Sequence, residues 1–253
     1  MRMFLLIMIG ATSVAAAADL PRGDCASPAG ATDLTHCDFT RRDLAGRSLA
    51  GARLVGVRLE SADLRRANLD GADLSRANAK WANFTRARLE GADLREADLF
   101  HATFDDAELG RARLQGANLF GANLIGTQAA GADFSGAYLK DILMEGIDIS
   151  GGSLRNCYSF RGVLTDARLV GTDLSGADLT GAALEQADLR QAIMKRTRLH
   201  GATLRRARFS GADLEGAEFS NADVWAADFD GALNRPDSVQ EALIEPFVVR
   251  DRR

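Results

Sequence analysis

The side chains that most often catalyse reactions or bind metals are few in this sequence, and their spacing keeps them apart. His36, His101 and His200 each lack a second ligand at the short spacing typical of metal sites. Cys37 directly follows His36, so the two could form a nucleophile and its base. A disulfide between Cys37 and Cys25 is the favoured interpretation, because the two cysteines flank the start of a regular repeat. We therefore expect no catalytic residue and no metal ion.

Carboxylates are numerous, but their regular spacing accounts for them. Aspartates such as Asp63, Asp73, Asp93 and Asp178 occur at one position of a five-residue repeat, which predicts a solvated ladder on the outside of the fold. The sequence contains no P-loop and no dinucleotide-binding glycine pattern, so we expect no cofactor and no enzymatic activity. The net charge of −4, from 31 basic and 35 acidic residues, predicts no binding to nucleic acid.

The five-residue repeat is the dominant feature of the chain. A position that usually carries Leu or Phe recurs 40 times from Leu34 to Phe229 without insertion or deletion, and only Ala79, Ala129 and Ser159 place a small residue there. A small residue, usually Ala, stands two positions before it, and two residues rich in Gly, Ser, Thr and Arg follow it. On a helix, residues five apart drift by about 140° per step, so no apolar stripe would form. A single long strand fails too, because an odd period alternates between its two faces.

A closed coil satisfies the pattern. The small and the large residue point inward on either side of one outward residue, and the next two residues turn a corner. Glycine suits such corners, as at positions 51, 71, 91, 131, 151, 171 and 211. Stacked turns would then form a solenoid in which each turn contacts only its neighbours.

The segments "ADLSGADLTGAAL", "GADLREADLF" and "GANLFGANL" resemble the pentapeptide-repeat family over about residues 32 to 231. The resemblance implies an all-β fold, a right-handed quadrilateral β-helix with 20 residues per turn. The 40 repeats would make about ten turns, roughly 48 Å long at about 4.8 Å per turn. The resemblance also implies a homodimer through the C-terminal end, as in some members of the family.

The two ends of the chain differ from the coil. Residues 1–18 have the pattern of a signal peptide, with cleavage after Ala18, so we expect a periplasmic or secreted protein without a membrane span after removal. An uncleaved anchor is the alternative. Residues 19–33 would cap the N-terminal end, residues 34–232 form the coil, and residues 233–253 form a C-terminal cap or tail. Ser238 and Glu241 have the spacing of a capping box, which predicts a short helix over the last turn.

Two sections depart from the repeat. Arg42 and Arg47 occupy small inward positions, where a buried guanidinium would be costly. The first turn is therefore expected to be open, irregular or turned outward, and held by the disulfide. In residues 140–163, Ile, Gly and Cys replace the inward Ala, and Met144, Ile149 and Ser159 replace central Leu or Phe. Because the period continues, we expect a repacked or bulged section rather than a domain boundary.

If residues 20 apart stack, outward apolar residues gather on two neighbouring sides of the coil. They form a candidate partner patch of Phe100, Phe120, Phe160, Tyr138, Tyr158, Ile125, Leu143 and Val163. The alternative is that these side chains only support adjacent turns.

Three classes of function follow. The favoured one is an exported, non-enzymatic scaffold that binds a protein partner whose identity is unknown. The alternative, implied by the resemblance, is a DNA mimic that binds DNA gyrase and confers quinolone resistance. The arginines on every side and the export signal count against this alternative. An enzyme has no supporting residues.

Overall fold

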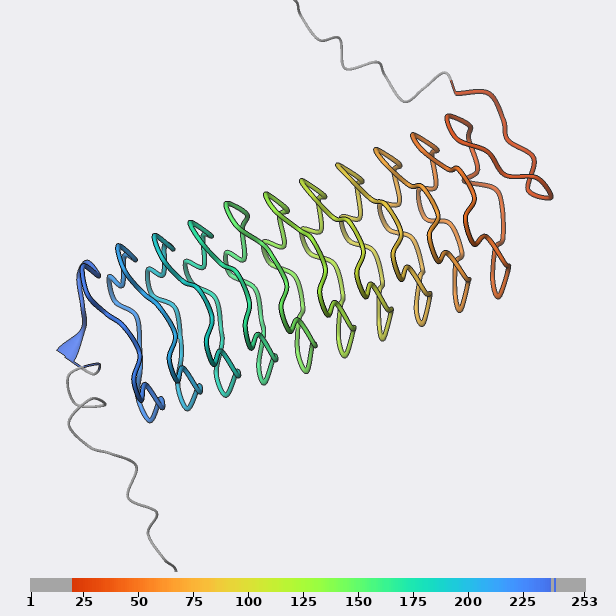
Figure 1. Cartoon of the computed structure of the whole chain (residues 1–253). Helices are drawn as coiled ribbons and strands as arrows, with labels where there is room; N and C mark the ends of the chain where they lie inside the picture. The colour runs from red at the N-terminus through yellow and green to blue at the C-terminus, as the bar shows by residue number, and fades with distance from the viewer. Residues whose placement is uncertain (1–19, 238, 240–253) are drawn as a thin grey trace, which may run out of the picture.

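The chain forms a straight rod of stacked coils (Figure 1). The computed structural model describes residues 20–237 and residue 239. The described chain begins at one end of the rod and finishes at the other (Figure 1). The predicted signal peptide, residues 1–18, lies outside the described residues. In the part of the chain that the structure describes, no helix has the length and apolar character needed to cross a bilayer.

Parallel pairing between residues 20 apart holds the rod together. The pairs begin with Asp33 and Arg53 and end with Asp213 and Leu233, at every fifth residue between them. A 20-residue turn therefore contributes one paired residue to each of four ladders. Each paired residue stands alone between inward-facing neighbours, and no longer strand occurs between residues 20 and 237. The expected stacking of residues 20 apart is confirmed.

The corners between the sides adopt a left-handed backbone conformation. At every fifth residue from Arg41 to Gly231 the φ angle is positive. At one such corner, Ala52 N–H donates to the Leu49 carbonyl oxygen at 3.0 Å and closes the turn around Gly51. Glycine fits without strain, as the sequence predicted, but other residues also occupy this conformation, including Trp81 (φ 54°). Their strain is offset by the ladders on both sides of each corner.

The polar outward residue has a structural role that the repeat alone does not reveal. Four of the five backbone N–H groups of a repeat donate to other backbone atoms; in one repeat they belong to Asp73, Leu74, Arg76 and Ala77. The fifth, on the first corner residue, donates to the outward Asp or Asn two residues before it. Ser75 N–H donates to Asp73 Oδ1 at 3.0 Å, and Thr85 N–H donates to Asn83 Oδ1 at 2.9 Å. This explains the Asp or Asn of the repeat, because the carboxylate or amide oxygen completes the turn.

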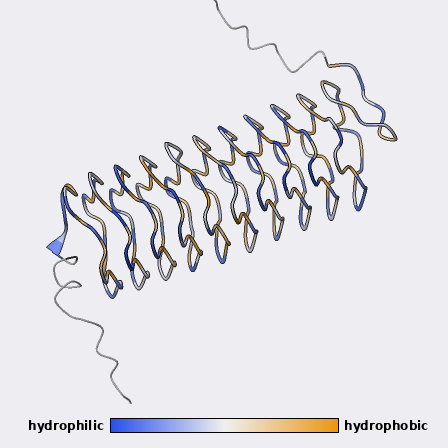
Figure 2. Cartoon of the chain, in the orientation of Figure 1, coloured by the Kyte–Doolittle hydropathy of each residue, from blue (hydrophilic) through white to orange (hydrophobic). Residues whose placement is uncertain are grey.

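The interior is filled by alternating small and large side chains. The inward Ala and the central Leu or Phe are buried along the rod, except that Ala227 and Ala232 in the last turn are partly buried. Figure 2 shows the resulting alternation of polar and apolar residues around every turn. Where two central positions 20 apart both carry Phe, the rings stack, as in Phe84 and Phe104, with centroids 4.6 Å apart. The core is therefore a column of apolar layers without a central channel.

Residues 140–163 keep the ladder unbroken and change only the packing. Ile142 is larger than the usual Ala, and the residue stacked on it is Gly162. A Cβ atom on Gly162 would lie 3.3 Å from the Ile142 side chain and 2.3 Å from Ser159 Oγ. The exchange of volume between neighbouring turns confirms a repacked section without a bulge.

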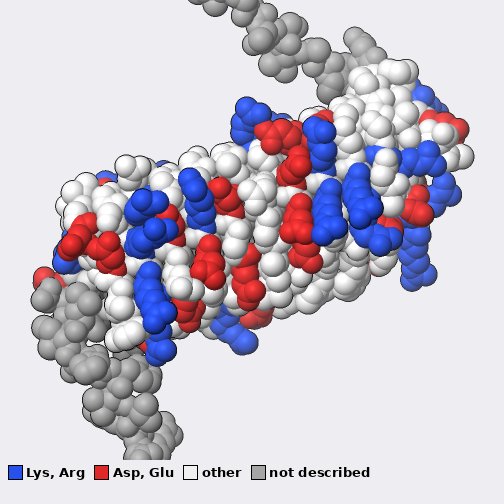
Figure 3. All heavy atoms as spheres, in the orientation of Figure 1, with Lys and Arg blue, Asp and Glu red and all other residues white. Residues whose placement is uncertain are grey.

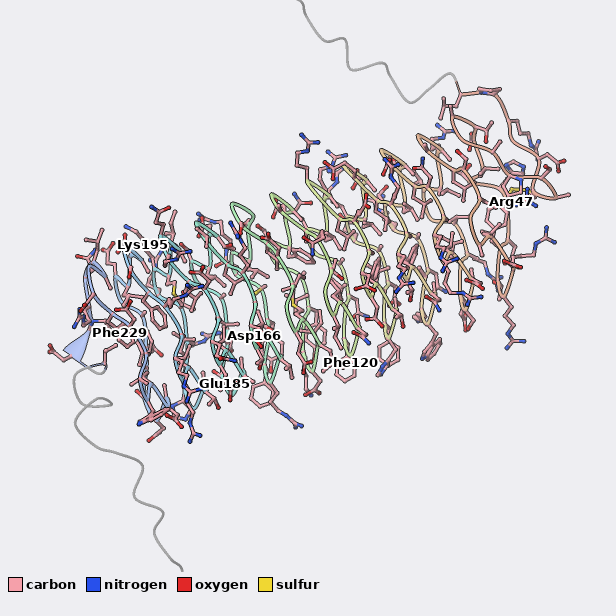
Figure 4. The ribbon with its side chains drawn as sticks, in the orientation of Figure 1. Arg47, Phe120, Asp166, Glu185, Lys195 and Phe229 are labelled. Atoms are coloured by element: carbon pink, nitrogen blue, oxygen red, sulfur yellow. A yellow bond between two sulfur atoms is a disulfide. The ribbon has the colours of Figure 1, made fainter. Side chains whose placement is uncertain are left out.

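The N-terminal end is closed by residues 20–31. Arg22 pairs with Asp33, and Cys25 is bonded to Cys37 with their Cα atoms 5.5 Å apart. Arg42 and Arg47 are exposed, although their backbone hydrogen bonds keep the regular register. Of the three alternatives for the first turn, the structure shows outward side chains on a regular backbone. Figure 4 shows Arg47 near the N-terminal end of the rod.

The C-terminal end is described only as far as residue 239. Asp237 and Val239 are helical, and Val239 is buried. The rest of the predicted helix over the last turn lies outside the described residues. The C-terminal tail that the predicted homodimer would use lies outside them as well.

Candidate interaction surface

His36 and the two cysteines of the N-terminal end lie close together, but the two cysteine sulfurs are bonded to each other in a disulfide. The ligand atoms of Cys25, His36 and Cys37 lie within 4.8 Å of one another. His36 Nε2 accepts a hydrogen bond from Arg22 Nε at 3.2 Å. Because the disulfide uses both sulfurs, neither cysteine offers a thiolate to a metal or to a substrate. Cys157 lies far along the chain, and burial raises the pKa of its thiol to about 12, with the charge of Asp178 adding to the effect.

A row of half-buried aromatic rings follows one corner of the rod, which we call the aromatic corner: Phe100, Phe120 and Phe160, with Lys140 in the remaining layer. Phe100 and Phe120 stack with centroids 5.4 Å apart, and the Lys140 ammonium lies 5.5 Å from the Phe120 centroid. Figure 4 shows Phe120 at the lower side of the rod.

Tyrosines extend this row onto the adjacent side. Tyr138 stacks on Phe120 at 6.1 Å and on Tyr158 at 5.3 Å. Phe160 lies 6.2 Å from Tyr158, so the series of rings is continuous. The rings therefore support one another between turns, as the alternative interpretation expected. Their edges remain accessible, since Tyr138 is 41% and Tyr158 is 36% exposed.

The side beyond the aromatic corner is apolar in its middle layers. We call it the Leu143 side; its outward residues in consecutive turns are Thr103, Asn123, Leu143, Val163 and Ala183. Leu143 is 38% exposed, and Ile125 at the far corner is 37% exposed. The structure thus brings together all eight residues of the predicted patch. It also adds Trp81 and His101, whose rings lie 5.4 and 4.4 Å from Phe100.

The fold does not require these apolar residues. At Tyr138, Leu143, Tyr158 and Val163 the usual Asp or Asn is missing. The backbone N–H groups two residues later, on Lys140, Glu145, Phe160 and Thr165, therefore have no acceptor within the described part of the chain. The chain forgoes four turn-closing hydrogen bonds in two adjacent sides. In the described structure the same hydrogen bond is missing after other outward residues, such as Thr103 and Glu108, so the feature particular to this surface is the run of apolar side chains.

Elsewhere the surface has many ion pairs, some within one turn and others between neighbouring turns. Asp188 is bound by Arg190 at 2.7 Å and by Arg208 at 2.8 Å. The hydrogen bond from Arg190 is the main reason that the pKa of Asp188 is lowered. Burial acts to raise the pKa of Asp93, but the hydrogen bonds from Arg95 and the charge of Arg113 outweigh it, and the pKa is lowered.

Figure 3 shows basic and acidic side chains interspersed on the visible face. A DNA mimic needs a continuous negative surface instead. The observed mixture therefore does not favour this alternative.

Comparison with known families supports the interpretation of the repeat. A model described as pentapeptide repeats matches residues 43–78, 80–116, 112–151, 163–196 and 197–233, with eight copies. The chain belongs to the pentapeptide-repeat family. No curated protein matches this pentapeptide-repeat protein in sequence.

Solved structures of the same family are similar to it. HetL, a pentapeptide-repeat protein involved in heterocyst differentiation regulation in the cyanobacterium Nostoc sp. strain PCC 7120, is 31% identical; the match covers 76% of this chain and 89% of HetL, with a TM-score of 0.47. QnrB1, a plasmid-mediated fluoroquinolone resistance protein, is 18% identical over 72% of this chain and 88% of its own, with a TM-score of 0.49. At these TM-scores the neighbours add nothing about partners.

Proposed function

We propose that this pentapeptide-repeat protein is an exported, non-enzymatic scaffold that binds a protein partner through the aromatic corner and the Leu143 side. The observation that carries the proposal is the run of outward apolar residues that replaces turn-closing Asp and Asn. Exposed apolar patches of this kind usually mark interaction sites. The stacked rings hold the patch rigid, which lowers the entropy lost on binding.

The proposed export is supported by two features. The first 18 residues combine one positive charge, an apolar run and small residues at positions 16 and 18. The disulfide between Cys25 and Cys37 suits an oxidising compartment. A mature N-terminus at Asp19 in a periplasmic or secreted fraction would support export, and a full-length cytoplasmic chain would contradict it.

The finer architecture is part of the proposal. We propose a right-handed, four-sided coil of about ten turns with a short helical cap, supported by the pairing of residues 20 apart. A homodimer through the C-terminal end is proposed with it, because Trp225 is 60% and Leu233 is 56% exposed near that end.

The partner surface can be tested by crosslinking and pull-down from cells that express the protein. Phe120→Ser with Tyr138→Ser removes two rings, and Leu143→Ser removes the aliphatic centre. Ile193→Ser is the matched control, because Ile193 is 39% exposed on another side of the rod. We expect the patch variants to lose a partner that the control retains. Unchanged partners together with a lower melting temperature would leave the rings with a purely structural role.

A further inference from the structure

We propose that the partner segment is a cationic amphipathic helix that lies along the Leu143 side, parallel to the axis of the rod. This inference rests on the proposed function and names the chemistry of its partner. The Leu143 side is apolar in its middle layers, and its two borders differ in character. The aromatic corner forms one border. The other border, which we call the acidic corner, contains Asp105, Asp106, Glu145, Asp166 and Glu185.

The acidic corner differs from the other charged surfaces because most of its carboxylates lack a cation. Asp106 is paired with Arg86 at 3.3 Å. The other four have no ion pair within the described residues. Asp166 accepts a hydrogen bond from Gln186 at 3.0 Å, and Glu185 accepts one from Thr165 at 3.4 Å. In Figure 4, Asp166 and Glu185 lie on the lower side of the rod, as Phe120 does.

Asp105 is a half-buried carboxylate of this corner that has no ion pair among the described residues. Its Oδ1 atom is buried without a hydrogen-bond partner, and its Oδ2 atom accepts from the Asn123 amide at 3.3 Å. Burial raises the pKa of Asp105, and the neighbouring charge of Asp106 raises it further. A cation brought to this corner would meet four carboxylates that no arginine or lysine of the described residues neutralises.

The basic groups of the opposite border do not balance these carboxylates. Arg161 is paired with Asp141 at 3.4 Å, and the Lys140 ammonium lies over the Phe120 ring. The Leu143 side therefore presents an apolar centre with aromatic rings along one edge and unpaired negative charge along the other. The complementary ligand has an apolar stripe with Lys or Arg along one flank.

The dimensions favour a helix as that ligand. One side of the coil is three residues wide, about 10 Å, which matches the diameter of an α-helix. Successive layers of the rod are about 4.8 Å apart, and successive helical turns are about 5.4 Å apart. The four layer spacings from Thr103 to Ala183 add up to about 19 Å, the length of a helix of about 13 residues. Over this length, the turns of the helix move out of register with the layers of the rod by only about 2 Å. Each helical turn can therefore place one apolar residue on the Leu143 side and one basic residue over the acidic corner.

The test uses the purified protein and three synthetic peptides of about 14 residues. The first has leucines along one stripe and lysines along one flank, the second has glutamates in place of the lysines, and the third is a scrambled form of the first. Fluorescence anisotropy measures each dissociation constant at about 50 mM and about 300 mM NaCl. We expect the lysine peptide to bind at least tenfold more tightly than both others and to lose affinity at the higher salt concentration.

Two triple variants separate local charge from net charge. Glu145→Gln, Asp166→Asn and Glu185→Gln neutralise three of the five carboxylates of the acidic corner without shortening the side chains. Glu60→Gln, Glu218→Gln and Asp230→Asn make the same change in net charge at carboxylates that are unpaired among the described residues and away from this corner. We expect the first triple variant to weaken the lysine peptide at least tenfold and to reduce its salt dependence, and the control to retain wild-type binding.

The outcomes distinguish this inference from the proposed function. In one outcome, Leu143→Ser abolishes capture of the cellular partner, but the lysine and glutamate peptides bind equally and the acidic-corner variant binds as the wild type does. This outcome would support the scaffold function and refute the cationic helix. If vesicles of anionic lipid or duplex DNA bind instead of the lysine peptide, the inference is likewise refuted. If the acidic-corner variant and its control lose affinity equally, net charge explains the binding and the assignment to this corner is wrong.

Discussion

The turn geometry predicts that an outward Asp or Asn stabilises the coil through its side-chain oxygen and not through its charge. Asp73 and Asn83 test this, because the side-chain oxygen of each accepts one hydrogen bond in the described structure, from the N–H of Ser75 and of Thr85 respectively. Neither forms an ion pair with a described residue. Asp73→Ala and Asn83→Ala remove the acceptor, whereas Asp73→Asn retains it.

The expected magnitude follows from the position of the turn. Both side chains are partly exposed, so water can replace the lost acceptor, and each Ala variant should lower the free energy of unfolding by about 1 kcal/mol. The two sites are ten residues apart on different sides of the coil, so the double variant should lose about 2 kcal/mol. Asp73→Asn should change the stability by less than about 0.5 kcal/mol.

Urea denaturation followed by circular dichroism measures these differences. Thr103→Ala is the matched control, since Thr103 is also outward but accepts no hydrogen bond from the N–H of Asp105 in the described structure. Equal stability of Asp73→Ala and Thr103→Ala would mean that the acceptor contributes nothing. Equal stability of Asp73→Asn and Asp73→Ala would mean that the charge of Asp73 is the cause.

Three further predictions concern the core, an ion pair and the cysteines. Leu119→Ala removes a fully buried central residue and should lower the free energy of unfolding by about 2 to 5 kcal/mol, measured in urea; a loss below about 1 kcal/mol would mean that the column is not tightly packed. Asp188→Asn should lower the melting temperature at pH 7. Because the pKa of Asp188 is lowered on folding, the carboxylate stabilises the fold above its unfolded pKa of about 4 and loses this effect as pH falls through the folded value. The difference between variant and wild type should therefore vanish near pH 2 in melting curves, and a constant difference would contradict the ion pair. Thiol titration should find no reactive cysteine in the native protein and one, Cys157, after unfolding without reductant, and reduction should cost up to about 3 kcal/mol; three reactive thiols would rule out the disulfide.

Much of the fold could be predicted from the sequence because the period determines it. Small and large residues at fixed spacing predict which side chains face inward, and the uninterrupted register predicts stacking across residues 140–163 despite Ile142 and Ser159. The role of Asp and Asn could not be seen in the same way, since their spacing equally suits a solvated ladder. Only the turn geometry shows that the oxygen of Asp73 meets the N–H of Ser75.

The candidate surface could be predicted in part. The positions of Tyr138 and Leu143 follow from adding multiples of 20, once the coil is assumed to have four sides. The contacts of His101 and Trp81 with Phe100 could not be predicted, because side chains at the corners take directions that the repeat does not specify. The unpaired state of Glu145 and Glu185 among the described residues also required the structure, because a sequence does not show which carboxylates an arginine reaches.

The stacking of residues 20 apart assembles the Leu143 side and its two borders. Disulfide crosslinking measures it directly. Thr103→Cys with Asn123→Cys joins paired positions about 4.8 Å apart, within the range of a disulfide, whereas Thr103→Cys with Gln128→Cys joins different sides. We predict that oxidation crosslinks the first pair completely and leaves the second pair free, as judged by mass spectrometry of digested protein. Equal crosslinking of both pairs, or none of the first, would contradict the 20-residue turn.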